Sequence, residues 1–384
     1  MSQIGSKKGR KAEDILLTER AKLTVEQQIE EFEKELKNTK YNKATQHHIG
    51  LVKAKIARLR DKQSQRSGGK SPEGFTVRKS GDATVVILGF PSAGKSTLLN
   101  ALTNAESLTA AYAFTTLSVI PGVLEYKDAK IQILDVPGIV EGAARGSGKG
   151  REVLSVLRSA ELVMIILDAQ YPDHYDVLLK EVHDSGLRLD QSFPDVRIVK
   201  SERGGLKIGT TVKLTNIDKL TIEKIMLEYK LNNASLVIRQ NITIDQFIDV
   251  LENNRHYPKS ILVVNKIDAI DDSQLRFLHE KFKNAIFISA EQKININNLK
   301  DSIFNKLDFI RIYTKDPGKA PDMKEPMIML NNSTIKEFCT KLHRDFVDKF
   351  KYARLWGSSA KFPGQRKMLK HKLKDGDIVE IHLK

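Results

Sequence analysis

Short apolar segments alternate with helix-like segments through the middle of the chain. The apolar segments have the length of buried strands, and the segments between them have the spacing of helices. This alternation is typical of βαβ units and predicts an α/β fold with a mainly parallel sheet. The predicted strands are TVVILGF (84–90), IQILDV (131–136), LVMIILDA (162–169), SILVVNK (260–266) and AIFISA (285–290).

Nearer the N-terminus, apolar residues recur at intervals of three and four, which is the spacing of one helix face. The first set is Val25, Ile29, Phe32 and Leu36, and the second is Ile49, Val52, Ile56 and Leu59. The segment NTKYNKAT between them offers asparagines and a threonine for a turn and an N-cap. We therefore predict a helical hairpin over 25–66, after a basic flexible tail (1–24) and before a linker (67–80).

The stretch between Asp168 and Asn265 is too long for a single crossover connection. It contains a strand-like segment around a Gly-Gly turn, then a helical segment, then another strand-like segment. We predict a small α+β unit inserted at 184–240. The segment 243–254 is expected to be a helix that returns to the parent sheet.

The C-terminal section, 309–384, has the pattern of a compact basic module with short strands and one helix. The strands are expected at MIML, YARLWG and DIVEIHL, and the helix at IKEFCTKLHRDFVDKF (335–350). The predicted buried stripe of this helix is Ile335, Phe338, Leu342, Phe346 and Phe350. Cys339, the sole cysteine, is expected to pack there; it excludes an intramolecular disulfide and fits a reducing cytoplasm.

The net charge of +15 lies at the two ends of the chain. Residues 1–80 hold 19 Lys and Arg against 10 Asp and Glu, and residues 309–384 hold 17 against 9. Residues 81–308 hold 27 against 29, so any attraction to a polyanion belongs to the ends. The apolar runs are too short to span a membrane, and no signal peptide is expected, which together favour a cytoplasmic protein.

The segment GFPSAGKST (89–97) matches the phosphate-binding pattern G-x-x-x-x-G-K-[ST] and lies between a predicted strand and a predicted helix. In such a loop, backbone N–H groups converge on phosphate oxygens at a helix N-terminus. Lys95 is expected to reach the β- and γ-phosphates, and Ser96 to bind Mg²⁺. The predicted nucleotide-binding residues here are Gly89, Pro91, Ser92, Ala93, Gly94, Lys95, Ser96 and Thr97.

Two further segments have the pattern of γ-phosphate sensors. Asp135 ends an apolar strand and can hold Mg²⁺ through water, and Gly138 can donate its N–H to the γ-phosphate. Within AYAFTTLSVIPGVLEY (111–126), Thr116 is the preferred threonine to close on Mg²⁺, with Thr115 as the alternative. The predicted catalytic residues are Lys95, Thr116 and Gly138, and the predicted metal ligands are Ser96, Thr116 and Asp135.

The tetrapeptide NKID (265–268) follows another apolar strand and favours guanine over adenine. The Asp268 carboxylate can accept two hydrogen bonds from guanine, whereas adenine offers no such pair of donors. Asn265 can bond the base and the loop backbone, and the stem of Lys266 can cover the ring. At the end of the next strand lie Ser289 and Ala290, and the Ala290 N–H is expected to meet guanine O6.

With these motifs in order, the chain resembles the developmentally regulated GTP-binding (DRG) proteins of the Obg superfamily. The resemblance covers nearly the whole chain and rests on NKATQHHIGLVKAKIARLR, GFPSAGKSTLLNALT, AFTTLSVIPGVLEY, DVPGIVEGAARGSGKGRE, NKID and FKYARLWGSSAKFPGQR. It implies a G domain at 81–308, interrupted by an insert similar to a ribosomal-protein S5 domain, and a TGS module of β-grasp shape at 309–384. It also implies a cytoplasmic, ribosome-associated GTPase of translation and, in eukaryotes, a dedicated partner protein.

Ile139 stands where many GTPases carry a glutamine that orients the attacking water. The resemblance places the chain among GTPases with a hydrophobic residue there, so that backbone, a threonine, an ion or a partner must position the water. Some relatives of this class use K⁺ held partly by a P-loop asparagine. The corresponding position here is Ser92, which departs from that pattern. The expected cofactors are GTP, GDP and Mg²⁺, with K⁺ as a further candidate.

Three functions are compatible with these residues. The leading hypothesis is a monomeric GTPase switch that docks on ribosomal RNA and uses neither membrane nor DNA. The second is an RNA or ribosome adaptor with negligible turnover, and the third, an ATPase, is disfavoured by Asn265 and Asp268. The predicted RNA-contacting cations are Lys53, Lys55, Arg58 and Arg60 in the hairpin, and Lys361, Arg366, Lys367, Lys370 and Lys372 in the end module.

Overall fold

The computed structural model describes residues 23–40, 42–43, 45–66, 81–103, 120–136, 156–343 and 345–384. The chain divides into two compact units, each built from two segments. The smaller unit combines Met1–Pro72 with Ser192–Arg255, and the larger combines Glu73–Gln191 with His256–Lys384. None of the described helices is long and apolar enough to span a membrane.

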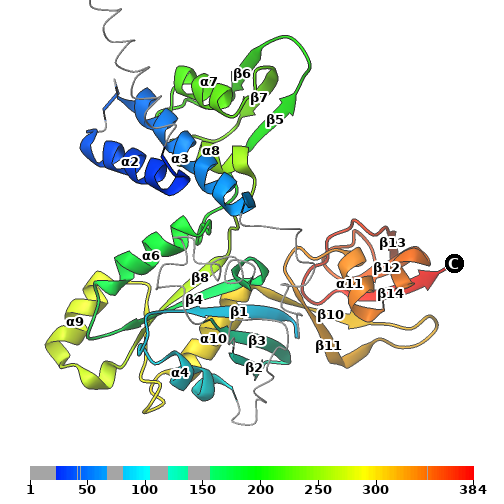
Figure 1. The fold of residues 1–384 in the computed structure, drawn as a ribbon. Coiled ribbons are helices and arrows are strands. Elements are labelled where there is room, and N and C mark those ends of the chain that lie inside the picture. Colours follow the sequence, from blue (N-terminus) through cyan, green and yellow to red (C-terminus); the bar gives the residue numbers. More distant parts are fainter. Residues whose placement is uncertain are drawn as a thin grey trace, which may run out of the picture. The chain divides into compact units, whose positions relative to one another are not determined.

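A six-stranded sheet forms the centre of the larger unit, with strand order β2-β3-β1-β4-β8-β9 (Figure 1). Every neighbouring pair is parallel except β2 with β3, which is antiparallel. This confirms the α/β fold class, and β2 is an additional strand that the pattern did not predict. The strands are β1 Ala83–Leu88, β2 Ile120–Tyr126, β3 Ala129–Asp135, β4 Leu162–Asp168, β8 Lys259–Asn265 and β9 Ile286–Phe287.

Helices cover both faces of this sheet, which explains why its central strands are apolar on both sides. Residues of α4 (Lys95–Leu102) and α10 (Ile296–Leu307) share one apolar core with alternate residues of β1, β3 and β4. The opposite residues of these strands pack with α6 (His174–Asp184). In the described part of this unit, the 3₁₀ turn η2 (Ile267–Ala269) and α9 (Asp272–Lys281) follow β8 along the chain.

The smaller unit contains the predicted hairpin, formed by α2 (Val25–Asn38) and α3 (Gln46–Arg66). A capping box between Thr24 and Gln27 begins α2, and Phe32 packs with residues of α3 in the seam. The rest of this unit is a three-stranded sheet with order β5-β7-β6 and two helices. These elements are β5 Val196–Lys200, β6 Leu206–Thr210, α7 Lys219–Glu228, β7 Ala234–Ile238 and α8 Ile244–Glu252.

The insert differs from its predicted boundaries of 184–240. In the structure, the inserted segment of the smaller unit runs from Ser192 to Arg255. Helix α8 does not return to the parent sheet as expected, because Phe247 and Ile248 lie in the apolar core formed by α7 and the three-stranded sheet. The spacing of apolar residues correctly indicated a helix here, but it carries no information about which core receives that helix.

The C-terminal module has a five-stranded sheet of order β11-β10-β14-β12-β13 with α11 (Ile335–Leu342) packed on one face. Strands β12 and β14 match the predicted YARLWG and DIVEIHL segments, and MIML lies in β11. Helix α12 (Asp345–Asp348) is a single short turn. The strands are β10 Phe309–Thr314, β11 Asp322–Leu330, β12 Phe350–Trp356, β13 Gln365–Lys367 and β14 Ile378–Leu383.

The predicted helix over 335–350 is wrong in its second half. Helix α11 ends at Leu342, whose side chain is exposed, and its C-cap residue His343 has an extended backbone. Phe350 is buried, as predicted, but it lies at the start of β12. Cys339 is fully buried among apolar residues, and this burial raises the pKa of its thiol to about 11.

Candidate nucleotide-binding site

Polar residues lie at the carboxyl ends of the parallel strands, and they include the predicted Asp135 and Asn265. Asp168 at the end of β4 is directly opposite Asn265 at the end of β8. Asp135 at the end of β3 is opposite Ile87 of β1, just before the glycine-rich loop. This edge of an open α/β sheet is where ligands bind in such folds.

The glycine-rich loop adopts a conformation that only some residues tolerate. Gly94 has φ of 86° and is the N-cap of α4. A Cβ atom at this position would lie 2.3 Å from Asn265 Nδ2, so the close approach of the two loops requires glycine. The Lys95 ammonium donates to the carbonyl oxygens of Gly89 at 3.1 Å and Phe90 at 3.0 Å. A cation and a helix N-terminus therefore meet at one point, which suits an anion.

Beside this loop, Ser96 and Asp135 form a pair of oxygen donors. Ser96 Oγ donates to Asp135 Oδ2 at 3.3 Å, while the buried Asp135 Oδ1 has no hydrogen-bond partner among the described residues. Burial raises the pKa of Asp135, and Lys95 and Ser96 oppose that rise. Burial also lowers the pKa of Lys95, against the attraction of Asp135. An unpaired carboxylate oxygen beside a hydroxyl fits a hard divalent cation such as Mg²⁺.

Asn265 joins two loops through its buried side chain. Its Nδ2 donates to the Ala93 carbonyl at 3.0 Å, and its Oδ1 accepts from the Ala290 N–H at 3.0 Å. The first bond agrees with the predicted contact to loop backbone. The second differs from prediction, because the Ala290 N–H that was expected to meet guanine O6 donates to Asn265 instead. Ser289 is also buried, and its hydroxyl accepts from the Gln292 N–H at 3.1 Å, which fixes the turn.

Lys266 has a partner that the sequence analysis did not assign. Its ammonium lies 2.7 Å from the buried carboxylate of Asp168. The backbone of Lys266 is left-handed, with φ of 63°, and Asp168 also accepts from the Gln170 N–H at 3.0 Å. Asp168 thus holds the lysine stem in place. The only sequence signal was an acidic residue at the end of an apolar strand, the same signal that identified Asp135.

Asp268 lies in the turn η2, and its side chain is exposed. Among the described residues, none forms a hydrogen bond or an ion pair with its carboxylate. The carboxylate is therefore available to a ligand, as the motif predicts. Four predicted residues, Thr115, Thr116, Gly138 and Ile139, lie outside the described residues, and their roles stay predictions.

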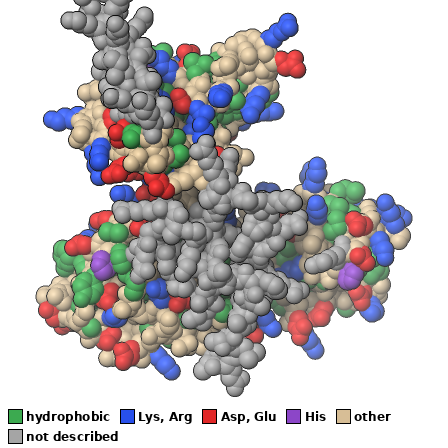
Figure 2. Space-filling view, viewed as in Figure 1, with side chains coloured by type: hydrophobic (Ala, Val, Ile, Leu, Met, Phe, Trp, Pro, Cys, Tyr) green, Lys and Arg blue, Asp and Glu red, His purple; other side chains and the backbone are tan. Residues whose placement is uncertain are grey.

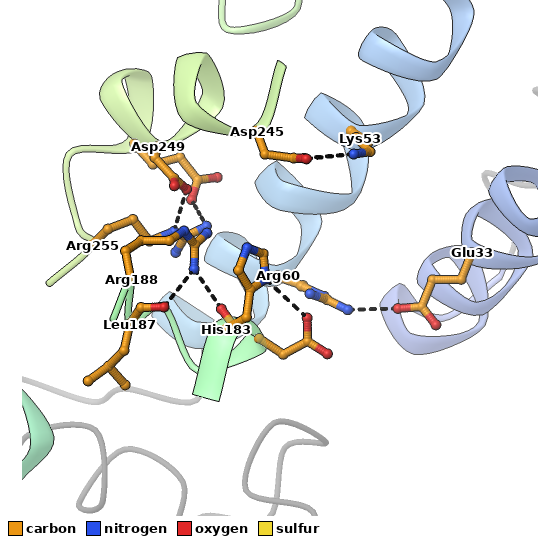
Figure 3. Close-up of polar contacts among 11 residues, drawn as sticks. Glu33, Lys53, Arg60, His183, Leu187, Arg188, Asp245, Asp249 and Arg255 are labelled. Carbon is orange, nitrogen blue, oxygen red and sulfur yellow. Dashed lines mark hydrogen bonds and ion pairs between the residues drawn. The ribbon is translucent and has the colours of Figure 1, made fainter. Parts of the chain in front are cut away.

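Three of the four hairpin cations lie at acidic residues of the same unit, and Figure 3 shows two of these pairs. Lys53 lies 2.7 Å from Asp245, and Arg60 lies 2.7 Å from Glu33. Figure 3 also shows Arg255 at Asp249, in the same unit. The other two candidates are likewise engaged: Arg58 is 2.6 Å from Glu228, and the Lys55 ammonium lies 5.8 Å from the ring centre of Phe32. The predicted RNA-contacting role of these four cations competes with internal pairing that the sequence did not reveal.

The cations of the C-terminal module are less engaged, and Figure 2 shows Lys and Arg side chains gathered on its visible face. Lys361, Arg366, Lys370 and Lys372 are exposed, and within the described part of the chain they form no ion pair. The Arg366 guanidinium lies 4.5 Å from the ring centre of Tyr352, which stacks on His382 at 4.4 Å. Lys367 is half-buried. This surface combines free cations with aromatic rings.

Three family models match the chain. Residues 84–193 match the model described as 50S ribosome-binding GTPase, and residues 203–309 match the C-terminal region of the MMR_HSR1 domain. Residues 310–383 match the TGS domain, in agreement with the predicted end module. The matches follow one another along the chain and leave uncovered the N-terminal region, residues 194–202 and the last residue.

Curated relatives match over almost the full length. Developmentally-regulated G-protein 3 of Arabidopsis thaliana is 44% identical over 364 residues, which are 93% of this chain and 98% of the relative. The chain belongs to the DRG family of GTP-binding proteins. A DRG protein 1 homolog of Dictyostelium discoideum is 43% identical over 94% of this chain and 99% of its own length. An uncharacterised GTP-binding protein of Methanocaldococcus jannaschii is 54% identical to this DRG-family chain, over 94% of it and 93% of the relative.

Proposed function

We propose that this DRG-family protein is a Mg²⁺-dependent GTPase that hydrolyses GTP to GDP and phosphate and acts as a ribosome-associated switch in translation. The observation that carries the proposal is the convergence of three motifs at one edge of the sheet. The bond from Asn265 to the Ala93 carbonyl connects the guanine-recognition segment to the phosphate loop. The contact of Ser96 with Asp135 connects that loop to the end of β3.

Each residue of this edge has a distinct task. The amides at the start of α4 would hold the phosphates, and Lys95 would exchange its two carbonyl partners for β- and γ-phosphate oxygens. Ser96 and Asp135 would hold Mg²⁺, Asp135 through water, and Thr116 would join them in the GTP state. When bound, Mg²⁺ supplies charge neutralisation on the β- and γ-phosphate oxygens.

Guanine selection rests on Asp268, whose exposed carboxylate has no partner among the described residues. Two hydrogen bonds from the base to a charged acceptor are strong enough to separate guanine from adenine, since such bonds contribute about 1.5–3 kcal/mol each. The ion pair with Asp168 would keep the aliphatic stem of Lys266 in position along the ring. Competition binding with ATP tests this selection directly.

Hydrolysis must proceed without a catalytic glutamine, because Ile139 cannot orient water. Gly138 and Thr116 would place the γ-phosphate, and a bound ion or the ribosome would order the nucleophile. We expect slow intrinsic turnover that K⁺ or ribosomes accelerate, with Ser92 at the position where K⁺-dependent relatives use asparagine. Equal rates in K⁺ and Na⁺, both with and without ribosomes, would count against these two routes. Ile139→Gln should retain turnover, since the native side chain is a bystander.

Docking on ribosomal RNA would use the TGS module rather than the hairpin. The module carries a surplus of eight positive charges in residues 309–384, and the exposed cations Lys361, Arg366 and Lys370 have no acidic partner in the described chain. Phosphate contacts of this kind are salt-dependent and largely independent of sequence. The protein would act in the cytoplasm as a monomer, with a DRG-family regulatory partner if the organism is eukaryotic.

A GTP-stabilised RNA or ribosome adaptor is the second candidate function, and Ile139 is the residue that favours it. In an adaptor, GTP would hold the edge of the sheet together and turnover would be incidental. Single-turnover hydrolysis measured with and without ribosomes separates the two functions. A rate that ribosomes raise identifies a switch, whereas an unchanged, negligible rate identifies an adaptor.

A further inference from the structure

The three-stranded sheet of the smaller unit has two unlike faces. Its inward face is apolar, with Ile198, Ile208 and Leu236 in the core that also contains residues of α7 and α8. Because strand residues alternate between faces, the residues between these point outward. The outward residues are Arg197 and Val199 of β5, Lys207 and Gly209 of β6, and Ser235 and Val237 of β7.

The register of the strands places two outward cations diagonally across this face. Arg197 and Gly209 are both paired with Val237, while Lys207 and Val199 are both paired with Ser235. The cations therefore lie on the two outer strands, about 10 Å apart in the direction across the sheet, which is two strand spacings. The side chains between these two cations are small, so the centre of the face is nearly flat.

The connection between β5 and β6 adds more positive charge at one end of the sheet. Lys200 and Arg203 are exposed there, next to Gly204 and Gly205, whose φ values are 108° and 69°. Residues 195–213 hold five Lys and Arg against two acidic residues. One of these acids, Asp195, lies 3.4 Å from Arg239. Figure 2 shows Lys and Arg side chains at this part of the unit.

These cations differ from those of the hairpin in the same unit. Arg197, Lys200 and Lys207 form no ion pair within the described part of the chain. By contrast, Lys53 and Arg58 are held by acidic side chains within 2.7 Å. The sheet of the smaller unit therefore offers a partner positive charge that no acidic side chain of the described chain neutralises.

We propose that the outward face of β5-β7-β6 binds the backbone of an A-form RNA duplex across its minor groove. That groove is wide and shallow and displays 2′-hydroxyls between two rows of phosphates, which matches a flat face with cations on opposite edges. Single-stranded RNA is bound largely by stacking on aromatic rings, and the outward residues include no aromatic side chain. The minor groove of B-DNA, about 6 Å wide, is too narrow to admit the face of a sheet. This inference rests on the proposed ribosomal role and identifies the structure that the insert would contact.

The test uses the full chain and a blunt RNA duplex of about 16 base pairs, the span of known duplex-binding domains. Arg197→Glu/Lys207→Glu is compared with Lys219→Glu/Lys224→Glu, which makes the same charge change on the exposed surface of α7. Fluorescence anisotropy over a salt series should show binding weakened about 10-fold or more by the sheet variant, with a shallower salt slope, and about unchanged by the α7 variant. The wild type should prefer this RNA to a DNA duplex of the same sequence and to single-stranded RNA. Equal weakening by both variants, no weakening, or no preference for duplex RNA would overturn the proposal.

Co-sedimentation of the same proteins with ribosomes in the presence of GTP separates this inference from the proposed function. If the wild type does not sediment with ribosomes, the ribosomal role fails. If the wild type and the sheet variant sediment equally, only the inference fails. Loss of sedimentation by the sheet variant, together with no duplex binding by the wild type, would assign the face to a ribosomal protein and overturn the RNA assignment. Circular dichroism and urea unfolding of each variant check that the smaller unit, which carries the substitutions, has folded.

Discussion

At the scale of single residues, Asp268 is the side chain on which guanine recognition depends. Asp268→Asn keeps the size of the side chain but replaces one acceptor oxygen with a donor group, which faces a donor of the base. We expect GTP affinity to fall about 100-fold or more, in line with the loss of charged hydrogen bonds worth about 1.5–3 kcal/mol each. Isothermal titration calorimetry with GTP and ATP measures the change.

The matched control for this substitution is Asp272→Asn, which removes the same charge from the first turn of α9. It should leave GTP affinity about unchanged. An Asp268→Asn protein that still binds GTP as the parent does, with the same preference over ATP, would show that the base is recognised elsewhere.

Cys339 is predicted to be chemically inert in the folded protein. Its side chain is fully buried, and burial raises the pKa of the thiol to about 11, so little reactive thiolate exists at pH 8. We expect labelling by a thiol reagent at pH 8 to be slow in buffer and rapid in denaturant. Rapid labelling of the native protein would mean that the core beside α11 opens easily.

At the scale of elements, Arg255 holds the end of α8 in the smaller unit. Its side chain lies 2.9 Å from Asp249 and 2.6 Å from Glu252, whose side chains are 3% and 4% exposed. Arg255→Ala would remove the cation that lies beside the buried carboxylates of Asp249 and Glu252, and breaking a buried pair costs about 3–5 kcal/mol. We expect a lower free energy of unfolding for this unit, measured by urea denaturation monitored by circular dichroism.

The loss of folding stability caused by Arg255→Ala should change with pH in a definite direction. Burial already raises the pKa of Glu252, with Arg255 opposing the rise, so removal of Arg255 should raise it further. A carboxyl group with a raised pKa in the folded state binds more protons there than in the unfolded state, so folding gains stability as pH falls. The destabilisation by Arg255→Ala should therefore be smaller at pH 5 than at pH 8. A penalty that grows towards low pH would contradict this account.

The elements also show what the sequence could and could not predict. Continuous apolar runs predicted β1, β4 and β8, because central parallel strands are buried on both faces. Strand β2 was not predicted, since Pro121 and Gly122 argue against a strand; it lies at the sheet edge, where proline is tolerated. The helical spacing that continues to Phe350 concealed the end of α11, because the same apolar residues also suit the start of β12.

The candidate site likewise contains residues that the sequence predicted and residues that it did not. Motif spacing predicted the phosphate loop and Asn265, because each motif is a short local pattern at the end of an apolar strand. Asp168 was missed because an acidic residue at a strand end is common, and its role depends on Lys266, which follows a different strand. The pairing of Lys53 with Asp245 joins residues 192 positions apart, which no local pattern can reveal.

At the scale of the whole molecule, the two positively charged ends of the chain differ in how far their cations are paired within the protein. This difference leads to a prediction about ribosome docking. Three of the four hairpin cations lie at acidic residues of their own unit, whereas Lys361 and Lys370 of the TGS module have no such partner in the described chain. Lys361→Glu/Lys370→Glu should therefore weaken co-sedimentation with ribosomes and reduce the slope of log affinity against log salt by roughly 2, about one per lost phosphate contact. The control Lys180→Glu/Lys283→Glu makes the same charge change on exposed positions of the larger unit outside the TGS module. If both variants weakened docking equally, net charge rather than this surface would be the cause, because a long-range field does not distinguish where the charge was removed.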